Sequence, residues 1–200
     1  PSFETVSLSR RERLLTITLQ RPDTLHAVNE QMHKDLVDVL AFVAEDPGSD
    51  VLVLTGAGRA FSAGGDLAYM AENAAHPERF DLDVRRAKRI VFAMLDLEKP
   101  LVCRLNGHAV GLGATLALLC DVIFAVDTAK IGDPHVKVGL VAGDGGALIW
   151  PQLIGFAKAK ELLSDPQKSV SAVAFAVGYA SENRFRIAFK KATGLAPKLW

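Results

Sequence analysis

The chain has 200 residues and half of them are hydrophobic, which is enough to bury a sizeable core in one globular unit. Its 23 basic and 23 acidic residues leave no formal net charge at pH 7, so composition gives no support to a nucleic-acid partner or an anionic membrane surface. No apolar run approaches the roughly 20 residues that span a bilayer, and two cysteines without a signal-peptide pattern predict a reduced, cytoplasmic setting.

The first elements predict a β–α–β order. Residues 14–19 alternate apolar and polar side chains, as a half-buried strand does. Asn29 is a residue type that caps helices, and apolar residues recur at helical spacing across 30–45. A short apolar, β-branched run at 51–54 then predicts a buried strand.

The middle of the chain continues this alternation. Residues 71–80 are polar and contain a proline, so we expect a mobile lid or loop there. The pattern then predicts an amphipathic helix over 82–95, a strand over 101–105, an apolar helix over 114–119 and a strand over 122–126.

Two glycine-rich turns, at 55–67 and 106–113, each follow a predicted strand and precede a helical segment. Glycines let the backbone approach a ligand closely and leave N–H groups accessible. Two such donors that converge on one oxygen would form an oxyanion hole, and each donor is worth about 2.7–4 kcal/mol of transition-state stabilisation. Neither turn has the Gly-Lys-Ser/Thr or Gly-x-Gly-x-x-Gly pattern of a phosphate loop.

With these turns, residues 1 to about 163 resemble the crotonase superfamily, the enoyl-CoA hydratase/isomerase family. The resemblance implies an α/β fold, the crotonase (ClpP/crotonase-like) ββα spiral with C-terminal helices, assembled as a homotrimer or a dimer of trimers. The motifs that carry it are Arg21-Pro22-Asp23 with Ala27 and Asn29, Leu54 to Leu67, Lys99-Pro100, Asn106-Gly107, Gly111 and Gly113, Leu116-Ala117, Cys120-Asp121, Gly139-Leu140 and Gly145-Gly146.

The resemblance also implies a substrate and a binding site. Members typically bind acyl-CoA thioesters and hold the thioester oxygen with two backbone N–H groups, which by motif are those of Ala63 and Leu112. Leu112 stands where the family commonly has glycine. No cofactor is expected apart from the CoA of the substrate, and no metal is predicted, because no two histidines have ligand spacing with cysteine or carboxylate support. The positions implied to bind substrate or CoA are Ala27, Gly64, Gly65, Asp66 and Leu67.

The chain departs from the hydratases at their two catalytic glutamates. Thr115 and His135 stand at those motif positions. A threonine hydroxyl cannot act as a base near neutral pH, so hydration by the two-glutamate mechanism is not expected at a high rate. We therefore expect a hydratase-like lyase or isomerase of the family in which His135 replaces a glutamate.

His135 and Asp144, nine residues apart on predicted loops, suggest a catalytic dyad. A carboxylate can orient an imidazole, fix its tautomer and stabilise the imidazolium, so the pair is expected to act as a general base near the oxyanion hole. The pattern resembles the β-diketone hydrolase branch, of the 6-oxocamphor hydrolase type, which cleaves a carbon–carbon bond. That branch has a further histidine where this chain has Leu112.

Several alternatives stay open. Asp144 could instead be a nucleophile, as in the aryl-CoA dehalogenases of the superfamily, or could cap a helix that begins near Gly146 while His135 is an ordinary loop histidine. The loss of both glutamates also allows a catalytically silent acyl-CoA binder.

The remaining histidines and the end of the chain carry weaker signals. His26 lies in a turn that the family uses near CoA, His33 and His76 are expected to be exposed, and His108 is expected to be structural.

Residues 1–163 are predicted to form the core domain. Residues 164–200 are predicted to form an incomplete C-terminal helical segment, because family members generally continue further.

Overall fold

The computed structural model describes residues 2–74 and 76–163, and it divides the chain into two compact units, residues 1–132 and 133–200. The predicted helical segment at 164–200 lies outside the described residues, so the expected division after residue 163 stays a prediction.

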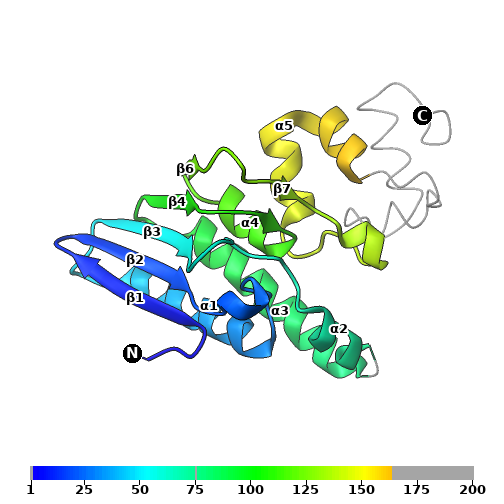
Figure 1. Ribbon diagram of the computed structural model, residues 1–200, viewed down its shortest axis with the longest axis horizontal. Helices are drawn as coiled ribbons and strands as arrows, with labels where there is room; N and C mark the ends of the chain where they lie inside the picture. The colour runs from blue at the N-terminus through cyan, green and yellow to red at the C-terminus, as the bar shows by residue number, and fades with distance from the viewer. Residues whose placement is uncertain (1, 75, 164–200) are drawn as a thin grey trace. The chain divides into compact units, whose positions relative to one another are not determined.

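The first unit is built on a five-stranded sheet whose spatial order, β1-β2-β3-β4-β6, follows the order of the chain (Figure 1). β1 and β2 form an antiparallel hairpin, and every later pairing in this sheet is parallel. A second, two-stranded parallel sheet joins β5 to β7. The strands are β1 (Val6–Arg11), β2 (Leu14–Leu19), β3 (Val51–Gly56), β4 (Leu101–Leu105), β5 (Ala109–Val110), β6 (Val122–Ala125) and β7 (Ile131–Gly132).

The helices of this unit are the short 3-10 helix η1 (Pro22–Thr24), α1 (Glu30–Glu45), α2 (Leu67–Asn73), α3 (Pro77–Leu95) and α4 (Leu112–Leu118). The predicted cap of α1 is confirmed, since Asn29 Oδ1 accepts a hydrogen bond from Met32 N–H at 3.0 Å. The lid or loop expected over 71–80 is wrong. Pro77 opens α3, and a proline is well tolerated in the first helical turn because its missing N–H has no partner there.

A buried polar cluster explains why α2 and α3 remain together across that proline. The Asp83 carboxylate of α3 accepts hydrogen bonds from Tyr69 Oη at 2.7 Å and from Asn73 Nδ2 at 2.8 Å, both on α2. Burial and the bond to Asp83 raise the pKa of Tyr69 to about 12. Three polar residues thus hold the two helices where the sequence pattern shows only polarity.

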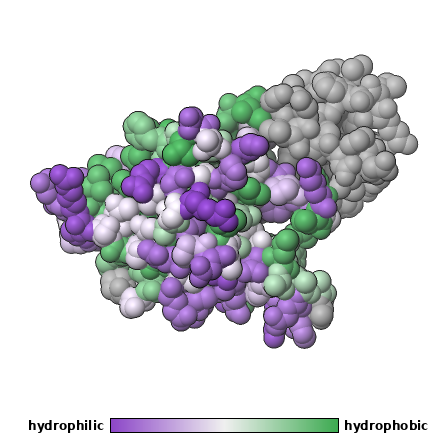
Figure 2. All heavy atoms as spheres, viewed as in Figure 1, coloured by the Kyte–Doolittle hydropathy of each residue, from purple (hydrophilic) through white to green (hydrophobic). Residues whose placement is uncertain are grey.

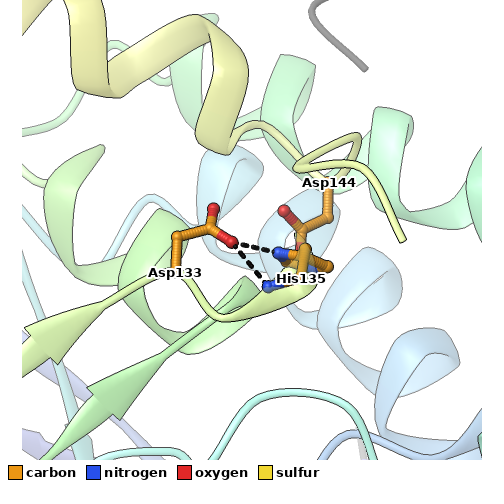
Figure 3. Close-up of side chains that lie close together, drawn as sticks. All are labelled: Asp133, His135 and Asp144. Atoms are coloured by element: carbon orange, nitrogen blue, oxygen red, sulfur yellow. Dashed lines mark hydrogen bonds and ion pairs between the residues drawn. The ribbon is translucent and has the colours of Figure 1, made fainter. Parts of the chain in front are cut away.

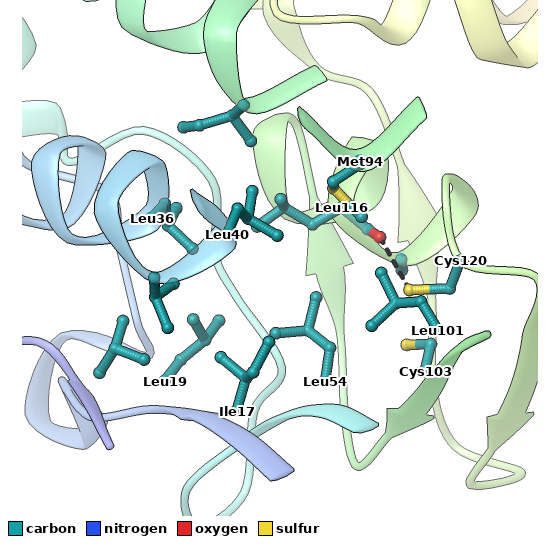
Figure 4. Close-up of a cluster of buried hydrophobic side chains, with 14 of the residues drawn as sticks. Ile17, Leu19, Leu36, Leu40, Leu54, Met94, Leu101, Cys103, Leu116 and Cys120 are labelled. Atoms are coloured by element: carbon teal, nitrogen blue, oxygen red, sulfur yellow. Dashed lines mark hydrogen bonds between the residues drawn. The ribbon is translucent and has the colours of Figure 1, made fainter. Parts of the chain in front are cut away.

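The core lies between the main sheet and its helices (Figure 4). Leu15, Ile17 and Leu19 on β2 are buried, while the residues between them are more exposed, as the two-residue period of a strand requires. α1 buries Leu36 and Leu40 against this layer, and together these side chains form one continuous cluster. Hydrophilic side chains gather instead at the turn between β1 and β2 (Figure 2).

The described part of the second unit contains the 3-10 helix η2 (His135–Val138) and the helix α5 (Gly146–Leu163). α5 is kinked at Gly155, whose φ of 77° and ψ of 159° are non-helical. Across the described ranges, no helix has both the length and the apolar character needed to cross a membrane.

Candidate active site

The two glycine-rich turns of the first unit lie against each other. Ser62 and Ala109 form a parallel bridge, and Val110 N–H donates to Ser62 O at 2.9 Å. The backbone at Gly64 comes so close that an added Cβ would lie 2.7 Å from Val110 O and 3.6 Å from Gly111 Cα. This contact brings the peptide groups on either side of Gly64 next to the start of α4.

Asn106 holds the first turn in place with its whole amide. Its Oδ1 accepts from Gly56 N–H at 3.1 Å and Thr55 Oγ1 at 3.3 Å, and its Nδ2 donates to Gly58 O and Ala60 O, each at 2.9 Å. An amide has two donors and one acceptor oxygen, so all its groups are engaged. The side chain therefore fixes the shape of one turn from the start of the other.

The backbone donors of the first turn differ in availability. Ala63, one of the two predicted oxyanion donors, gives its N–H to Leu25 O at 2.9 Å, so this group is not free for a substrate oxygen. Among the described residues, none accepts a hydrogen bond from the N–H of Gly65 or from that of Leu112, which begins α4. In the first turn, the N–H of Ala63 is therefore engaged within the fold, whereas that of Gly65 has no acceptor among the described residues.

The predicted substrate-binding positions around Ala27 and Asp66 are joined by Arg21. Its guanidinium donates to Ala27 O and forms an ion pair with Asp66 Oδ2 at 3.2 Å. Asp66 Oδ1 also caps α2 by accepting from Ala68 N–H at 3.2 Å. Asp66 therefore has a structural role here, whereas Leu67 leaves 69% of its surface exposed.

Thr115 stands on α4 where the resemblance expects a glutamate, and it is completely buried. Within the described ranges its Oγ1 has no hydrogen-bond partner. A buried hydroxyl left in this state costs about 1–3 kcal/mol, so the position is unusual for a purely structural residue. The Thr115 hydroxyl still cannot act as a general base near neutral pH.

A second cluster lies wholly within the other unit and joins His135 to two carboxylates (Figure 3). His135 Nδ1 forms a hydrogen bond with Asp133 Oδ1, which also accepts from the backbone N–H of His135 at 3.2 Å. On the other side of the ring, Nε2 forms an ion pair with Asp144 Oδ2 at 3.0 Å. The predicted meeting of His135 and Asp144 is confirmed, and Asp133 is an addition that sequence reasoning missed.

The protonation state of His135 follows from these two neighbours. Burial alone would lower the pKa of His135, but the hydrogen bonds and charges of Asp133 and Asp144 outweigh it and raise that pKa to about 10. The ring is therefore an imidazolium near neutral pH and has no lone pair to accept a proton. This arrangement conflicts with the predicted role of His135 as the general base.

The protons on both ring nitrogens of His135 also bear on whether this group can bind a metal. Asp133, His135 and Asp144 each offer a ligand atom, all within 4.8 Å of one another. A metal needs a deprotonated imidazole nitrogen, however, and both ring nitrogens here face carboxylates across a proton. We assign no metal to the group.

The remaining histidines are placed by ordinary structural contacts. His26 is fully buried: its Nδ1 accepts from Arg21 N–H at 2.9 Å and its Nε2 lies 2.7 Å from Ala57 O. His33 is only 13% exposed and its Nδ1 lies 3.8 Å from Asp83 Oδ1, so its predicted exposure is wrong. His76 is exposed as predicted, and His108 Nδ1 accepts from Lys130 N–H at 3.1 Å.

Both cysteines are free and buried in the first unit, as expected from their apolar surroundings. A hydrogen bond with Cys103 and burial raise the pKa of the Cys120 thiol well above its usual range. Because the thiolate is the reactive form, Cys120 offers no nucleophile at neutral pH.

Comparison with known proteins identifies the class to which this fold and these turns belong. Residues 9–181 match the family model for enoyl-CoA hydratase/isomerase, and the chain belongs to that family. The chain is 33% identical over 183 residues to a crotonyl-CoA hydratase of Syntrophomonas wolfei. It is 38% identical over 151 residues to a 1,2-epoxyphenylacetyl-CoA isomerase of Escherichia coli.

These alignments cover 90% and 74% of this chain but 69% and 58% of the respective relatives. Among solved structures, an enoyl-CoA hydratase/isomerase from Mycobacterium paratuberculosis matches with a TM-score of 0.79 and 36% identity, over 100% of this chain and 83% of that one. The predicted crotonase fold, a mixed α/β architecture with a parallel sheet, is thereby confirmed.

Proposed function

We propose that this chain is an enzyme that acts on an acyl-CoA thioester and binds the thioester carbonyl oxygen between the N–H groups of Gly65 and Leu112. The observation that carries the proposal is the pair of unclaimed donors on two turns that touch. The neighbouring Ala63 N–H is already bonded to Leu25 O. The names of the relatives, a hydratase and an isomerase of CoA thioesters, support the substrate class.

Donors at this place act on charge that develops during the reaction. When a proton leaves the carbon next to the thioester, or a nucleophile adds to a conjugated double bond, negative charge collects on the carbonyl oxygen. Fixed N–H groups stabilise that charge without reorganising, and this stabilisation usually lowers the barrier more than any other effect in such catalysis. The reaction also requires an acid–base group, and the second unit carries a titratable cluster of Asp133, His135 and Asp144.

The residues at the two glutamate positions favour proton-transfer chemistry over ordinary hydration. Thr115 cannot take a proton from water near neutral pH, so one of the two carboxylates of the hydratase mechanism has no substitute at its position. We therefore place isomerase-like or lyase-like proton transfer first. Assembly as a homotrimer or a dimer of trimers remains a prediction.

A second candidate function is hydrolytic cleavage of a carbon–carbon bond in a β-diketone or β-ketoacyl substrate. The contact between His135 and Asp144 at 3.0 Å favours it, since that is the dyad expected from the resemblance to the diketone hydrolases. The leucine at position 112, where that branch has a histidine, weighs against it.

The proposal is tested by removing one donor without disturbing the helix that carries it. Leu112 is the first residue of α4, a position that accepts proline readily, and Gly111 before it has the freedom to adapt. Leu112→Pro deletes the N–H, whereas Leu112→Ala keeps it and serves as the matched control. Calorimetric titration with acetyl-CoA and with free CoA measures the contribution of the acyl oxygen.

We expect acetyl-CoA to bind more tightly than CoA to the parent chain and to Leu112→Ala, and Leu112→Pro to lose this difference. Turnover of the acyl-CoA that proves to be a substrate should fall by about 10²–10³-fold in the proline variant. Equal binding of acetyl-CoA by all three proteins would contradict the assignment of the donor. If thioesters bind in this way but none is turned over, the chain is a catalytically silent acyl-CoA binder.

A further inference from the structure

The cluster around His135 contains more than the dyad that the sequence suggests. We propose that Asp133 is a positioning residue, which fixes His135 with both ring N–H groups directed at carboxylates and so leaves the second oxygen of Asp144 as the proton acceptor of the group. This inference rests on the proposed function only for its catalytic consequence. The arrangement itself stands on the contacts of the second unit.

Asp133 is built to hold the ring in one orientation. Its Oδ1 accepts both the ring Nδ1–H and the backbone N–H of His135, so the carboxylate binds the side chain and its own main chain together. Only 2% of the Asp133 side chain is exposed, which keeps water from competing for these bonds. A charged acceptor in such a site forms stronger hydrogen bonds than a neutral one.

The other oxygen of Asp133 is fixed by the start of α5. A Cβ added at Gly146 would lie 2.2 Å from Asp133 Oδ2, far inside any allowed contact. The carboxylate is therefore pressed against a glycine backbone and has no room to turn away from His135. Gly146 does not have a positive φ, so its backbone conformation does not require glycine. The close approach of Asp133 Oδ2 is what requires it.

As a consequence, neither ring nitrogen of His135 can accept a proton. Asp133 and Asp144 are the charged groups that the described residues direct at the ring, one at each nitrogen. With a proton on each nitrogen the ring carries a positive charge and cannot accept another. It can only hold the two carboxylates apart and balance part of their charge.

Two carboxylate oxygens of the group are buried and receive no hydrogen bond from a described residue, Asp133 Oδ2 and Asp144 Oδ1. Gly146 lies against Asp133 Oδ2 and leaves it no room for a further partner, so Asp144 Oδ1 is the acceptor that remains, while Asp144 Oδ2 is bound to His135. A carboxylate oxygen in this state is a base held in place by the ion pair on its other oxygen. In an enolisation step, the substrate Cα–H bond breaks, its electron pair forms the enolate, and the proton binds to Asp144 Oδ1.

The protonation state of His135 can be measured directly by NMR on the whole chain with 13C-labelled histidine, after treatment with a chelator. The signal of His135 is assigned from its loss in His135→Gln. We expect it to show the imidazolium form beyond about pH 8 in the parent chain. In Asp133→Asn the pKa of His135 should fall by about 1–3 units, because one adjacent negative charge is gone.

A second variant protects the test against a folding failure of Asp133→Asn. Gly146→Ala keeps every charge but forces its new Cβ onto Asp133 Oδ2. Gly143→Ala is the matched control in the same loop, where the new Cβ would meet only Val141 Cγ2 at 3.3 Å and Val141 O at 3.9 Å. We expect Gly146→Ala to lower the pKa of His135 and Gly143→Ala to leave it unchanged.

Three results would overturn the assignment: a parent His135 that titrates near its ordinary pKa, an Asp133→Asn variant that loses stability without moving that pKa, or a Gly146→Ala variant with the parent titration curve. Broadening of the His135 signal by stoichiometric Mn²⁺ would show that the group is a cation site instead. None of these readouts uses an acyl-CoA, so failure of the proposed function would leave them unaffected. Conversely, loss of activity in Asp144→Asn with retained acetyl-CoA binding would tie Asp144 to the chemical step.

Discussion

The N–H of Ala63 lies 2.9 Å from the carbonyl oxygen of Leu25 and donates a hydrogen bond to it. We therefore predict that Ala63→Pro lowers the free energy of unfolding by about 1–3 kcal/mol, since it removes a donor and leaves a carbonyl unpaired. Ala63→Ser, which keeps the N–H, is the control, and urea titration is the measurement. If Ala63→Pro kept its stability but lost the preference for acetyl-CoA over CoA, Ala63 would be the oxyanion donor after all.

The amide of Asn106 should matter in proportion to the bonds that it makes. Asn106→Asp keeps an acceptor for Gly56 N–H but loses both donors, while Asn106→Leu loses every bond. We expect the free energy of unfolding to fall on the order of 3 kcal/mol in the leucine variant and by a smaller amount in the aspartate variant. Equal stability of the two variants in chemical denaturation would show that the donated bonds contribute nothing.

Alanine substitutions at Gly64 and Gly58 distinguish the cost of backbone strain from the cost of a steric clash. Both have positive φ, +83° and +69°, so alanine is strained at either position. A Cβ at Gly58 meets nothing within 4 Å, whereas one at Gly64 lies 2.7 Å from Val110 O. Gly58→Ala should cost about 1 kcal/mol of unfolding free energy and Gly64→Ala clearly more, and only Gly64→Ala should weaken acetyl-CoA binding. Calorimetry of both variants decides this.

The titration of His135 sets an alkaline limit on stability. Its pKa is about 10 in the folded chain, against 6.5 for an unperturbed histidine, so the folded state holds a proton that the unfolded state releases. The resulting stabilisation is complete below about pH 6.5 and is lost as the pH rises toward 10. Unfolding measured across this range should show a smaller decline in His135→Gln than in the parent chain. Parallel curves would refute the prediction.

His26 should act in the opposite direction. Burial and the charge of Arg21 lower its pKa, and a bond to Ala57 O only partly offsets them, so the folded state keeps the ring neutral. The unfolded chain takes up a proton below about pH 6.5, and folding stability should fall as the pH drops through that value. In a comparison of unfolding at about pH 7 and pH 5, His26→Gln should lose less stability than the parent chain. An unchanged difference would mean that His26 does not titrate on unfolding.

Local sequence patterns predicted most of the first unit because its strands and helices carry strong periodicity. The alternation in β2, the apolar run in β3 and the capped helix α1 appear where expected. The prediction of a lid or loop over 71–80 was wrong because the helices there are stabilised by hydrogen bonds to Asp83, which lies outside that segment. β5 and β7 have two residues each, too few for any periodicity to appear.

In the candidate site, too, the sequence predicted local features but not contacts with distant residues. The resemblance located both turns, and the spacing of His135 and Asp144 suggested their contact, which the structure contains. The engagement of Ala63 could not be foreseen, because its partner Leu25 is a distant backbone carbonyl without any sequence signal. Asp133 did carry a signal, since an aspartate two residues before another residue often accepts that residue's N–H.

The order of strands in the main sheet bears on how the chain can fold as it is synthesised. Because spatial order and chain order coincide, each strand after the β1–β2 hairpin joins the edge formed by the strand before it, and none has to insert between two earlier ones. A nascent chain released as far as β3 would already pair three strands, but its last strand would expose an unpaired apolar edge. Each parallel addition also requires a long crossover, so growth of the sheet is slower than closure of the first hairpin. During translation the unpaired edge of the sheet therefore passes from β2 to β3, then to β4 and finally to β6, which remains its edge strand.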